Sequence, residues 1–270
     1  MAASQTVTVE YSGNLAIVTL DNQEKLNALS QEDYYKLAST LREIAQHDEV
    51  LVTLLIGKGR FFSAGADITR PPPDLGKIEP RQYWLRALVL NNIDLADAFY
   101  THPKVLVTAL NGPVLGLSAA VVAHSDFIFA TPKAYLLTPF SSLGLVTEGG
   151  ASLAFVRRLG VSKAKEALLS SRRIPAEELH QVGFVNQVLD AGGDEEKFKE
   201  MVLSEIRSRF GDHLVGSSVL EIKRLLREPG DREFSAQAVQ EVFGGLRKFV
   251  DGVPQAEFKK IATGQKRHKL

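Results

Sequence analysis

The chain has 270 residues, of which 44% are hydrophobic and 24% charged, as expected for a globular protein. Its 32 Lys and Arg residues balance its 32 Asp and Glu residues, which argues against a nucleic-acid binder that neutralises many phosphates. There is no cysteine, so disulfides, thiolate metal ligands and thiol nucleophiles are excluded. No apolar run approaches the ~18 residues that a membrane span needs, and the N-terminal stretch lacks the pattern of a secretory signal.

The first third of the chain predicts a hairpin, a helix and a buried strand. Residues 6–20 indicate two short strands around a Ser-Gly-Asn turn. Ser30 and Asp33 form a capping-box-like pair at the start of a helix. Residues 51–57 form a continuous apolar run, which is typical of a strand that is buried on both faces. One apolar stripe of the helix is expected to be buried, namely Tyr34, Leu37, Leu41 and Ile44.

The middle of the chain alternates between predicted strands and helices. The proline-rich stretch 70–80 is predicted to be a surface loop, because proline lacks the amide donor and fixes φ. A helix is expected over 81–100, and buried strands over 104–110 and 126–130. This alternation favours an α/β fold. From about Glu195 helical patterns dominate, so we predict a core region 1–195 and a helical C-terminal region 196–270.

Two loops rich in small residues follow two of the buried strands. They are GRFFSAGADI (59–68) and the start of LNGPVLGLSAAVVAHSD (110–126). Small side chains and glycine allow a ligand to approach backbone N–H groups, which can stabilise an oxyanion. The alternative is that each loop is an ordinary tight turn after a strand. The second loop also resembles the nucleophile elbow of serine hydrolases, but seven residues separate Ser118 from its strand and the last glycine is missing.

A lone acid, Glu148, ends the apolar stretch SSLGLVTEGG (141–150). Apolar surroundings raise the pKa of a carboxyl group and make it a stronger base. The alternative is an acid that merely stabilises the first turn of a helix predicted over 149–159.

These stretches together resemble the crotonase superfamily, the enoyl-CoA hydratase/isomerase family. The resemblance rests on KLNALS, GRFFSAGADI, LNGPVLGLSAAVVAHSD, LGLVTEGG and RRIPAEELHQVGFVNQVL, which occur in the family order over about residues 8–190. Within the family the chain is most similar to the fungal peroxisomal Δ3,Δ2-enoyl-CoA isomerases. The resemblance implies a spiral of ββα units with a C-terminal helical region that drives assembly into trimers or dimers of trimers.

The resemblance also assigns roles to residues. It implies that Glu148 is the catalytic base, that the N–H groups of Ala66 and Leu117 form the oxyanion hole, and that Asn92 holds Glu148. For Asn92, a solvated position on a helix face is the alternative. Ala120 and Phe140 replace the two acids of the hydratases, which argues against water addition. The implied substrate-binding residues are Ala64, Gly65, Ala66, Asp67, Ile68, Leu117, Asn27 and Ala28.

The implied function is a Δ3,Δ2-enoyl-CoA isomerase that converts 3-enoyl-CoA to trans-2-enoyl-CoA in fatty-acid β-oxidation. The alternatives are a dienoyl-CoA isomerase, a specialised enoyl-CoA hydratase, or a non-catalytic acyl-CoA-binding protein of the same fold. No metal or separate cofactor is expected, because CoA is part of the substrate. The final tripeptide His268-Lys269-Leu270 resembles a peroxisomal address, so we expect a peroxisomal protein that binds the import receptor.

Overall fold

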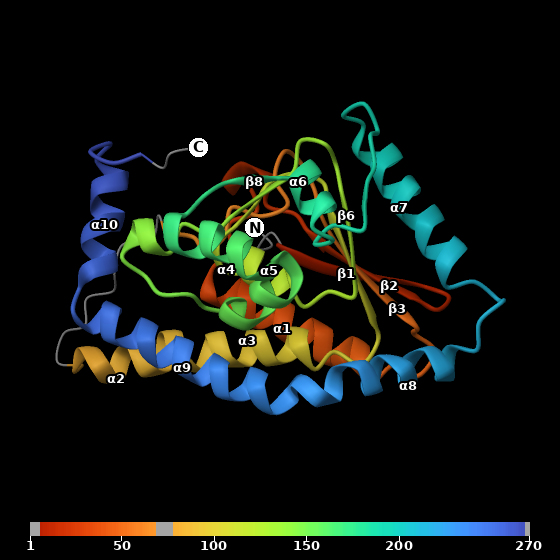
Figure 1. The fold of residues 1–270 in the computed structure, drawn as a ribbon, viewed down its shortest axis with the longest axis horizontal. Helices are drawn as coiled ribbons and strands as arrows, with labels where there is room; N and C mark the ends of the chain where they lie inside the picture. The colour runs from red at the N-terminus through yellow and green to blue at the C-terminus, as the bar shows by residue number, and fades with distance from the viewer. Residues whose placement is uncertain (1–5, 69–77, 268–270) are drawn as a thin grey trace, which may run out of the picture.

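The computed structural model describes residues 6–68 and 78–267, which fold around a six-stranded sheet (Figure 1). The strand order is β1-β2-β3-β4-β6-β9, in which β1 and β2 are antiparallel and all other neighbours are parallel. A smaller sheet has the order β5-β7-β8. The strands are β1 (Val7–Ser12), β2 (Leu15–Leu20), β3 (Val52–Gly57), β4 (Val105–Leu110), β5 (Val114–Leu115), β6 (Phe127–Ala130), β7 (Tyr135–Leu137), β8 (Ile174–Pro175) and β9 (Gln187–Val188).

Both faces of the large sheet are covered, which explains why β3 and β4 read as continuous apolar runs. Because side chains alternate along a strand, Leu55 and Leu106 belong to the core shared with α1, α3, α4 and α5. Leu54 and Val107 belong to the opposite core, which α7 closes. The central strands therefore have no solvent-exposed face.

Helices surround the sheets in the part of the chain that the structure describes. Ser30 and Asp33 form the predicted capping box at the start of α1, and the predicted apolar stripe of α1 is buried. The α-helices are α1 (Gln31–Ala45), α2 (Pro80–Trp84), α3 (Leu90–Tyr100), α4 (Gly116–Val122), α5 (Ala151–Ser170), α6 (Ala176–Gln181), α7 (Glu195–Arg209), α8 (Gly216–Arg227), α9 (Asp231–Val250) and α10 (Val253–Ala262), and η2 (Leu85–Val89) is a π-helical segment.

The helix predicted over 81–100 is present but is not uniform. It consists of α2, the π-helical η2 and α3, and it begins at Pro80, whose missing N–H costs nothing at the first position of a helix. The prediction of a loop over 70–80 is therefore wrong at Pro80, and residues 70–77 lie outside the described residues. The helix predicted over 149–159 begins at Ala151, and its helical geometry is interrupted at Gly160.

The C-terminal helices pack on the core rather than apart from it. Phe198, Val202 and Ile206 of α7 share one hydrophobic core with the sheet, and α9 lies along α2 and α3 (Figure 1). The helix α10 packs against the segment Ser141–Leu143, which leads toward Glu148. The division at residue 195 remains a prediction. In the described part of the chain, no helix combines the length and hydrophobicity that crossing a membrane requires.

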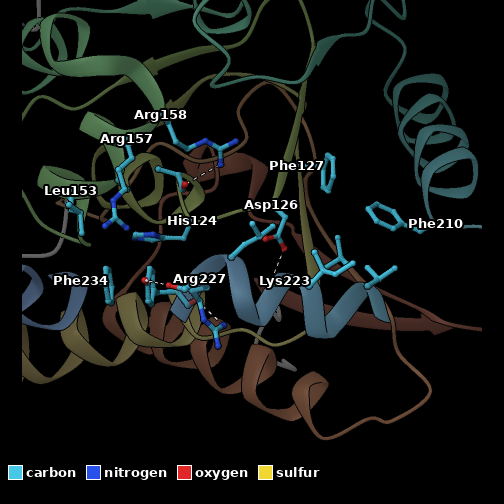
Figure 2. A pocket seen from close by; sticks show the side chains of 17 residues that line it. His124, Asp126, Phe127, Leu153, Arg157, Arg158, Phe210, Lys223, Arg227 and Phe234 are labelled. Atoms are coloured by element: carbon cyan, nitrogen blue, oxygen red, sulfur yellow. Dashed lines mark hydrogen bonds and ion pairs between the residues drawn. The ribbon is translucent and has the colours of Figure 1, made fainter. Parts of the chain in front are cut away.

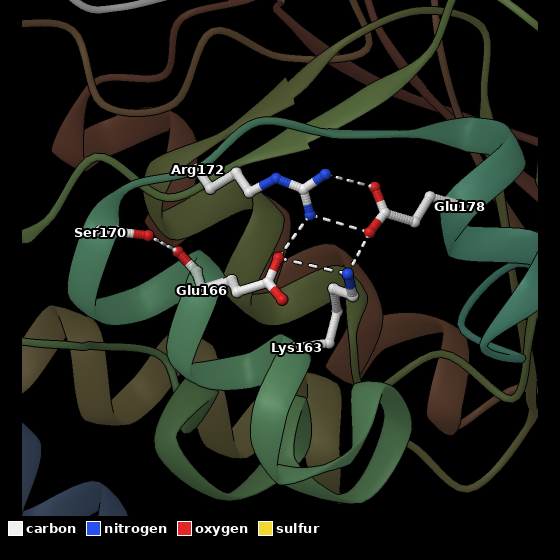
Figure 3. Close-up of polar contacts among 5 residues, drawn as sticks. All are labelled: Lys163, Glu166, Ser170, Arg172 and Glu178. Carbon is white, nitrogen blue, oxygen red and sulfur yellow. Dashed lines mark hydrogen bonds and ion pairs between the residues drawn. The ribbon is translucent and has the colours of Figure 1, made fainter.

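An ionic network fixes the end of α5 to α6 (Figure 3). Lys163 and Arg172 lie between Glu166 and Glu178, and Arg172 donates to both carboxylate oxygens of Glu178 at 2.8 and 2.9 Å. The neighbouring Ser171 has a left-handed backbone (φ +51°), and its hydroxyl is 2.8 Å from that of Ser141. The hydrogen bond between these two hydroxyls joins the end of α5 to the segment that begins the loop toward Glu148.

Candidate active site

The two small-residue loops lie side by side at the ends of β3 and β4. Ser63 forms a parallel β-bridge with Val114, and the N–H of Leu115 donates to the carbonyl of Ser63 at 2.9 Å. Gly65 (φ +85°) has no room for a side chain, because a Cβ there would lie 2.9 Å from the carbonyl oxygen of Leu115. Glycine at this position therefore permits the close approach of the two loops.

Two backbone N–H groups are left over by this pairing. The N–H of Leu29 donates to the carbonyl of Gly65, and the N–H of Asp67 donates to the carbonyl of Leu29. Between them, the N–H of Ala66 donates to no protein group within the described chain. Leu117 lies in the first turn of α4, whose N-terminus has no side-chain cap, and its N–H is likewise without an acceptor among the described residues. These are the two donors that the family resemblance implies for an oxyanion hole.

Three buried hydroxyl groups support the loops from behind. The hydroxyl of Ser63 is 2.8 Å from that of Ser118, which is 3.1 Å from that of Tyr34. Ser63 also donates to the carbonyl of Asn27 and accepts from the N–H of Gly65. Sequence reasoning missed this network, because it joins side chains that are 55 and 84 residues apart.

The predicted substrate-binding residues do not all offer their side chains to a ligand. The side chain of Asn27 is fully buried and donates to the carbonyls of Lys58 and Phe61, both at 2.8 Å. It also accepts from the N–H of Asn22 at 2.7 Å. Asn27 therefore shapes the loop by its side chain, and the half-buried Ala28 follows it.

The first loop turns from buried to exposed along its length. Ala64 is half-buried, Gly65 is buried, and Ala66 and Ile68 are exposed. The carboxylate of Asp67 is nearly inaccessible and pairs with Lys25 at 2.8 Å. Asp67 thus ties this loop to the segment that precedes α1.

The close packing of Gly149 on α4 brings Glu148 to the loops. A Cβ on the next residue, Gly149 (φ +69°), would lie 2.9 Å from Cβ of Ala120 and 3.0 Å from Cδ1 of Leu117. The backbone beside Glu148 therefore packs directly on α4, next to one of the two N–H donors. The hydratase-acid positions Ala120 and Phe140 hold buried apolar side chains in the same core.

Burial gives Glu148 the pKa of a general base. It raises the pKa of this half-buried residue from the usual 4.5 to about 7. Asn92, buried on α3, donates from Nδ2 to Glu148 Oε2 at 2.5 Å, which lowers the pKa in part, and the negative charge of Glu241 raises it further. A carboxylate with this pKa is poised for proton transfer near neutral pH.

The turn after Glu148 is held by a neutral histidine. Nε2 of His124, which follows α4, lies 2.8 Å from the carbonyl oxygen of Gly149. Burial lowers the pKa of His124 to about 4, so the ring is neutral at pH 7 and donates to this carbonyl.

His124 also lines a separate cavity of ≈ 460 Å³ between α5, α8 and the start of β6 (Figure 2). None of the predicted site residues lines this cavity. Two of its cations are paired with carboxylates: Lys223 contacts Asp126 at 2.5 Å, and Arg157 contacts Glu233 at 2.6 Å. We therefore place the candidate active site at Glu148 and the two loops, and not in this cavity.

Comparisons with known proteins show which family the chain belongs to. The family model described as enoyl-CoA hydratase/isomerase matches residues 10–211. A Delta(3,5)-Delta(2,4)-dienoyl-CoA isomerase of Pyricularia oryzae is 56% identical over 99% of this chain and 100% of its own length. A 3,2-trans-enoyl-CoA isomerase of Saccharomyces cerevisiae is 33% identical over 99% of this chain and 98% of its own.

A solved structure supports the fold independently. The crystal structure of an enoyl-CoA hydratase/isomerase from Pseudoalteromonas atlantica T6c superposes with a TM-score of 0.83, covers 98% of this chain and 100% of its own, and is 24% identical. The predicted α/β crotonase fold with C-terminal helices is therefore confirmed. The chain belongs to the enoyl-CoA hydratase/isomerase family.

Proposed function

We propose that the protein is a Δ3,5-Δ2,4-dienoyl-CoA isomerase that uses Glu148 as its base. The resemblance seen in the sequence favours Δ3,Δ2-enoyl-CoA isomerisation and leaves the dienoyl reaction as an alternative. The relative that is 56% identical, and is matched over its full length, is named a dienoyl-CoA isomerase. The relative named as a 3,2-trans-enoyl-CoA isomerase is 33% identical. An isomerase of either kind is supported by one observation. The Glu148 carboxylate, with a pKa of about 7, lies beside the N–H groups of Ala66 and Leu117, which have no protein acceptor within the described chain.

Both isomerisations begin with the same proton transfer. The Glu148 carboxylate takes a proton from C2, which lies between the thioester carbonyl and the C3=C4 double bond. The electron pair of the broken C–H bond delocalises toward the thioester oxygen, where the N–H groups of Ala66 and Leu117 stabilise the charge. Loss of one such donor costs roughly 10²–10³ in rate in other enzymes.

The reactions differ in where the proton returns. In a 3,5-dienoyl-CoA the charge extends to C6, and protonation there gives double bonds at C2 and C4. In a 3-enoyl-CoA protonation at C4 gives the 2-enoyl product. Glu241 is the carboxylate whose charge acts on Glu148, and both of its oxygens accept backbone hydrogen bonds. We therefore assign the return of the proton in the second step to Glu148 as well.

Δ3,Δ2-Enoyl-CoA isomerisation remains the second candidate, because a specific observation favours it. A single carboxylate reaches C2 and C4 more readily than C2 and C6, since the latter pair is separated by two more bonds. A steroid isomerase with one Asp base and an oxyanion hole moves a proton between two carbons by the same logic.

A substrate comparison tests the proposal. Purified protein would be given 3,5-octadienoyl-CoA and 3-octenoyl-CoA, which have equal chain length, and kcat/KM would be measured for each. We expect the dienoyl substrate to be preferred and Glu148→Gln to lose activity by about 10³-fold or more, because the base is removed. Glu200→Gln, at an exposed carboxylate of α7 on the opposite side of the sheet from α4, serves as the control.

The outcomes separate the candidates. Preference for 3-octenoyl-CoA would replace the dienoyl proposal with the mono-enoyl one. Binding of either ligand without turnover in the wild type would indicate a non-catalytic acyl-CoA-binding protein. In D₂O, transfer by Glu148 predicts that part of the abstracted proton is retained at C6, whereas a second donor predicts complete deuteration there.

We also propose that the protein forms a homo-oligomer and is peroxisomal. Exposed apolar side chains along α8, including Ile222, Leu225 and Leu226, support assembly, and Leu226 is 80% exposed. The peroxisomal proposal and its import receptor rest on His268-Lys269-Leu270 alone, which lies outside the described residues.

A further inference from the structure

A buried carboxylate on α9 lies close to the proposed base. Glu241 is 5% exposed, and its charge acts on Glu148. Charged side chains are almost never buried unless they are paired, so this carboxylate needs a partner. The partners are backbone groups: Oε2 accepts from the N–H of Gly150 at 2.7 Å, and Oε1 accepts from the N–H of Ser152 at 2.8 Å.

The contact replaces a missing helix cap. The N-cap of α5 is Gly150, which has no side chain to accept from the first turn. A larger residue does not fit there, because a Cβ on Gly150 would lie 2.5 Å from the ring of Phe234. Glu241 supplies the cap from another helix, at the end of α5 where a negative charge is favoured.

The same contact determines where Glu148 points. Gly149 and Gly150 both have positive φ, a region that glycine adopts without penalty but does not hold by itself. His124 holds the turn at the Gly149 carbonyl, and Glu241 holds it at the next N–H. Glu148 directly precedes this turn, so movement of the turn moves the base.

We propose that Glu241 is a positioning residue of this enzyme: it fixes the turn that aims Glu148 and places a negative charge beside it. The inference rests on the proposed function, in which Glu148 is the base. Glu241 itself does not touch substrate, because both of its oxygens are occupied.

The charge has a predictable effect on Glu148. The polar and titratable groups around the base are Asn92 of α3, Tyr34 of α1, His124 after α4 and Glu241 of α9. Burial keeps Tyr34 and His124 neutral at pH 7, and Asn92 is neutral, so Glu241 is the charged member of this group. Its removal lowers the pKa of Glu148, which makes Glu148 a weaker base.

The test compares three variants on 3,5-octadienoyl-CoA and 3-octenoyl-CoA. Glu241→Gln removes the charge and one of the two hydrogen bonds, whereas Glu241→Asp keeps the charge but shortens the reach. Glu233→Gln, on the exposed face of the same helix, is the matched control. Steady-state kinetics between about pH 5.5 and 8.5 would give kcat, KM and the acid limb of kcat/KM.

For Glu241→Gln we expect kcat to fall by about 10- to 100-fold with KM nearly unchanged, because a base that is misplaced by a fraction of an ångström reacts slowly. The acid limb should move to lower pH. For Glu241→Asp we expect a similar loss of kcat with the limb near its wild-type position. Glu233→Gln should match the wild type.

The inference is overturned if Glu241→Gln folds and keeps the wild-type kcat and acid limb, or if it only lowers the melting temperature. If Glu241→Gln does not fold, Glu241→Asp decides, and a wild-type kcat in that variant overturns the inference. Failure of the proposed function looks different, because then the wild type is inactive or Glu148→Gln remains active.

Discussion

At the scale of single residues, the reactivity of Glu148 is set by three opposing influences. Burial and the charge of Glu241 raise its pKa, and the hydrogen bond from Asn92 lowers it. The result, about 7, keeps a useful fraction of carboxylate at neutral pH while leaving it basic enough to take a proton from C2. Asn92 therefore both holds the base and limits how basic it becomes.

Replacing Asn92 tests this balance. In Asn92→Ala the carboxylate loses its donor, so the pKa of Glu148 rises and the acid limb of kcat/KM moves to higher pH. This is the opposite direction to that expected for Glu241→Gln. We also expect kcat at pH 7 to fall by about 10-fold or more, because a smaller fraction of Glu148 is ionised and its orientation is less restricted.

The neighbouring Asn91 offers a matched control. Its side chain donates to the backbone carbonyl of Ala87 on its own helix and not to Glu148. Asn91→Ala should therefore leave the pH profile in place. An unchanged profile in Asn92→Ala would show that the hydrogen bond does not influence proton transfer.

At the scale of elements, the packing of the Gly149 turn on α4 brings the base to the oxyanion donors. The hydrogen bond between Ser171 and Ser141 anchors the start of the same loop, and α10 packs against the segment Ser141–Leu143. The loop is thus fixed at both ends by elements that are distant in sequence. Its geometry depends on close contact between backbone and helix, which a side chain at residue 149 would prevent.

Gly149→Ala should damage both stability and activity. The added Cβ meets Ala120 and Leu117 at 2.9 and 3.0 Å, and alanine is disfavoured at φ +69°. We expect a loss of about 2–4 kcal/mol in the free energy of unfolding and a clear fall in kcat, measured by urea denaturation and by the dienoyl assay.

Gly183→Ala separates strain from contact. Gly183 also has a positive φ (+80°), but nothing lies within 4 Å of a Cβ at this position. We expect a loss of only about 1–2 kcal/mol there, with normal kcat. Equal losses in the two variants would argue that the contact with α4 is unimportant.

At the scale of the whole molecule, two histidines whose pKa values are lowered by burial make the fold sensitive to acid. Burial, followed by the charges of Lys223, Lys104 and Arg227, lowers the pKa of His102 to about 3. Burial likewise lowers the pKa of His124 to about 4. Both rings bind their proton more readily when unfolded, where the usual pKa is 6.5.

The free energy of unfolding should therefore fall as the pH drops below about 6.5. A depressed pKa contributes stability that is fully present above the unfolded pKa and is lost as the pH approaches the folded one. For His102 this amounts to about 2 kcal/mol by about pH 5. Glu148 has the opposite effect on the free energy of unfolding. Its pKa is raised, so it destabilises the fold as it ionises at higher pH, and this cost disappears as the pH falls.

Urea denaturation between about pH 7.5 and 5 checks this expectation. His102→Gln keeps a polar group that can reach the hydroxyl of Thr53, which lies 2.8 Å from Nε2 of His102, and it should show a shallower pH dependence. His213→Gln, at an exposed position, should behave like the wild type. The same slope in all three proteins would contradict the assignment.

The sequence by itself determined the local elements and the residue types at the site. Apolar runs indicated the buried strands, the Ser30–Asp33 pair indicated the start of α1, and the glycines marked the loops where backbones approach closely. These features depend on interactions between residues close in the chain, so a pattern of spacing is enough to reveal them. The resemblance to a family of known fold then connected the loops with Glu148.

Only the tertiary structure decided how distant side chains meet. Asn92 and Glu148 are 56 residues apart, and Glu241 lies 91 residues from Gly150. Asn27, expected beside CoA, turns inward to bind the carbonyls of Lys58 and Phe61. Packing chooses one direction for each side chain, and that choice depends on the neighbours that folding brings together, which spacing along the chain does not encode.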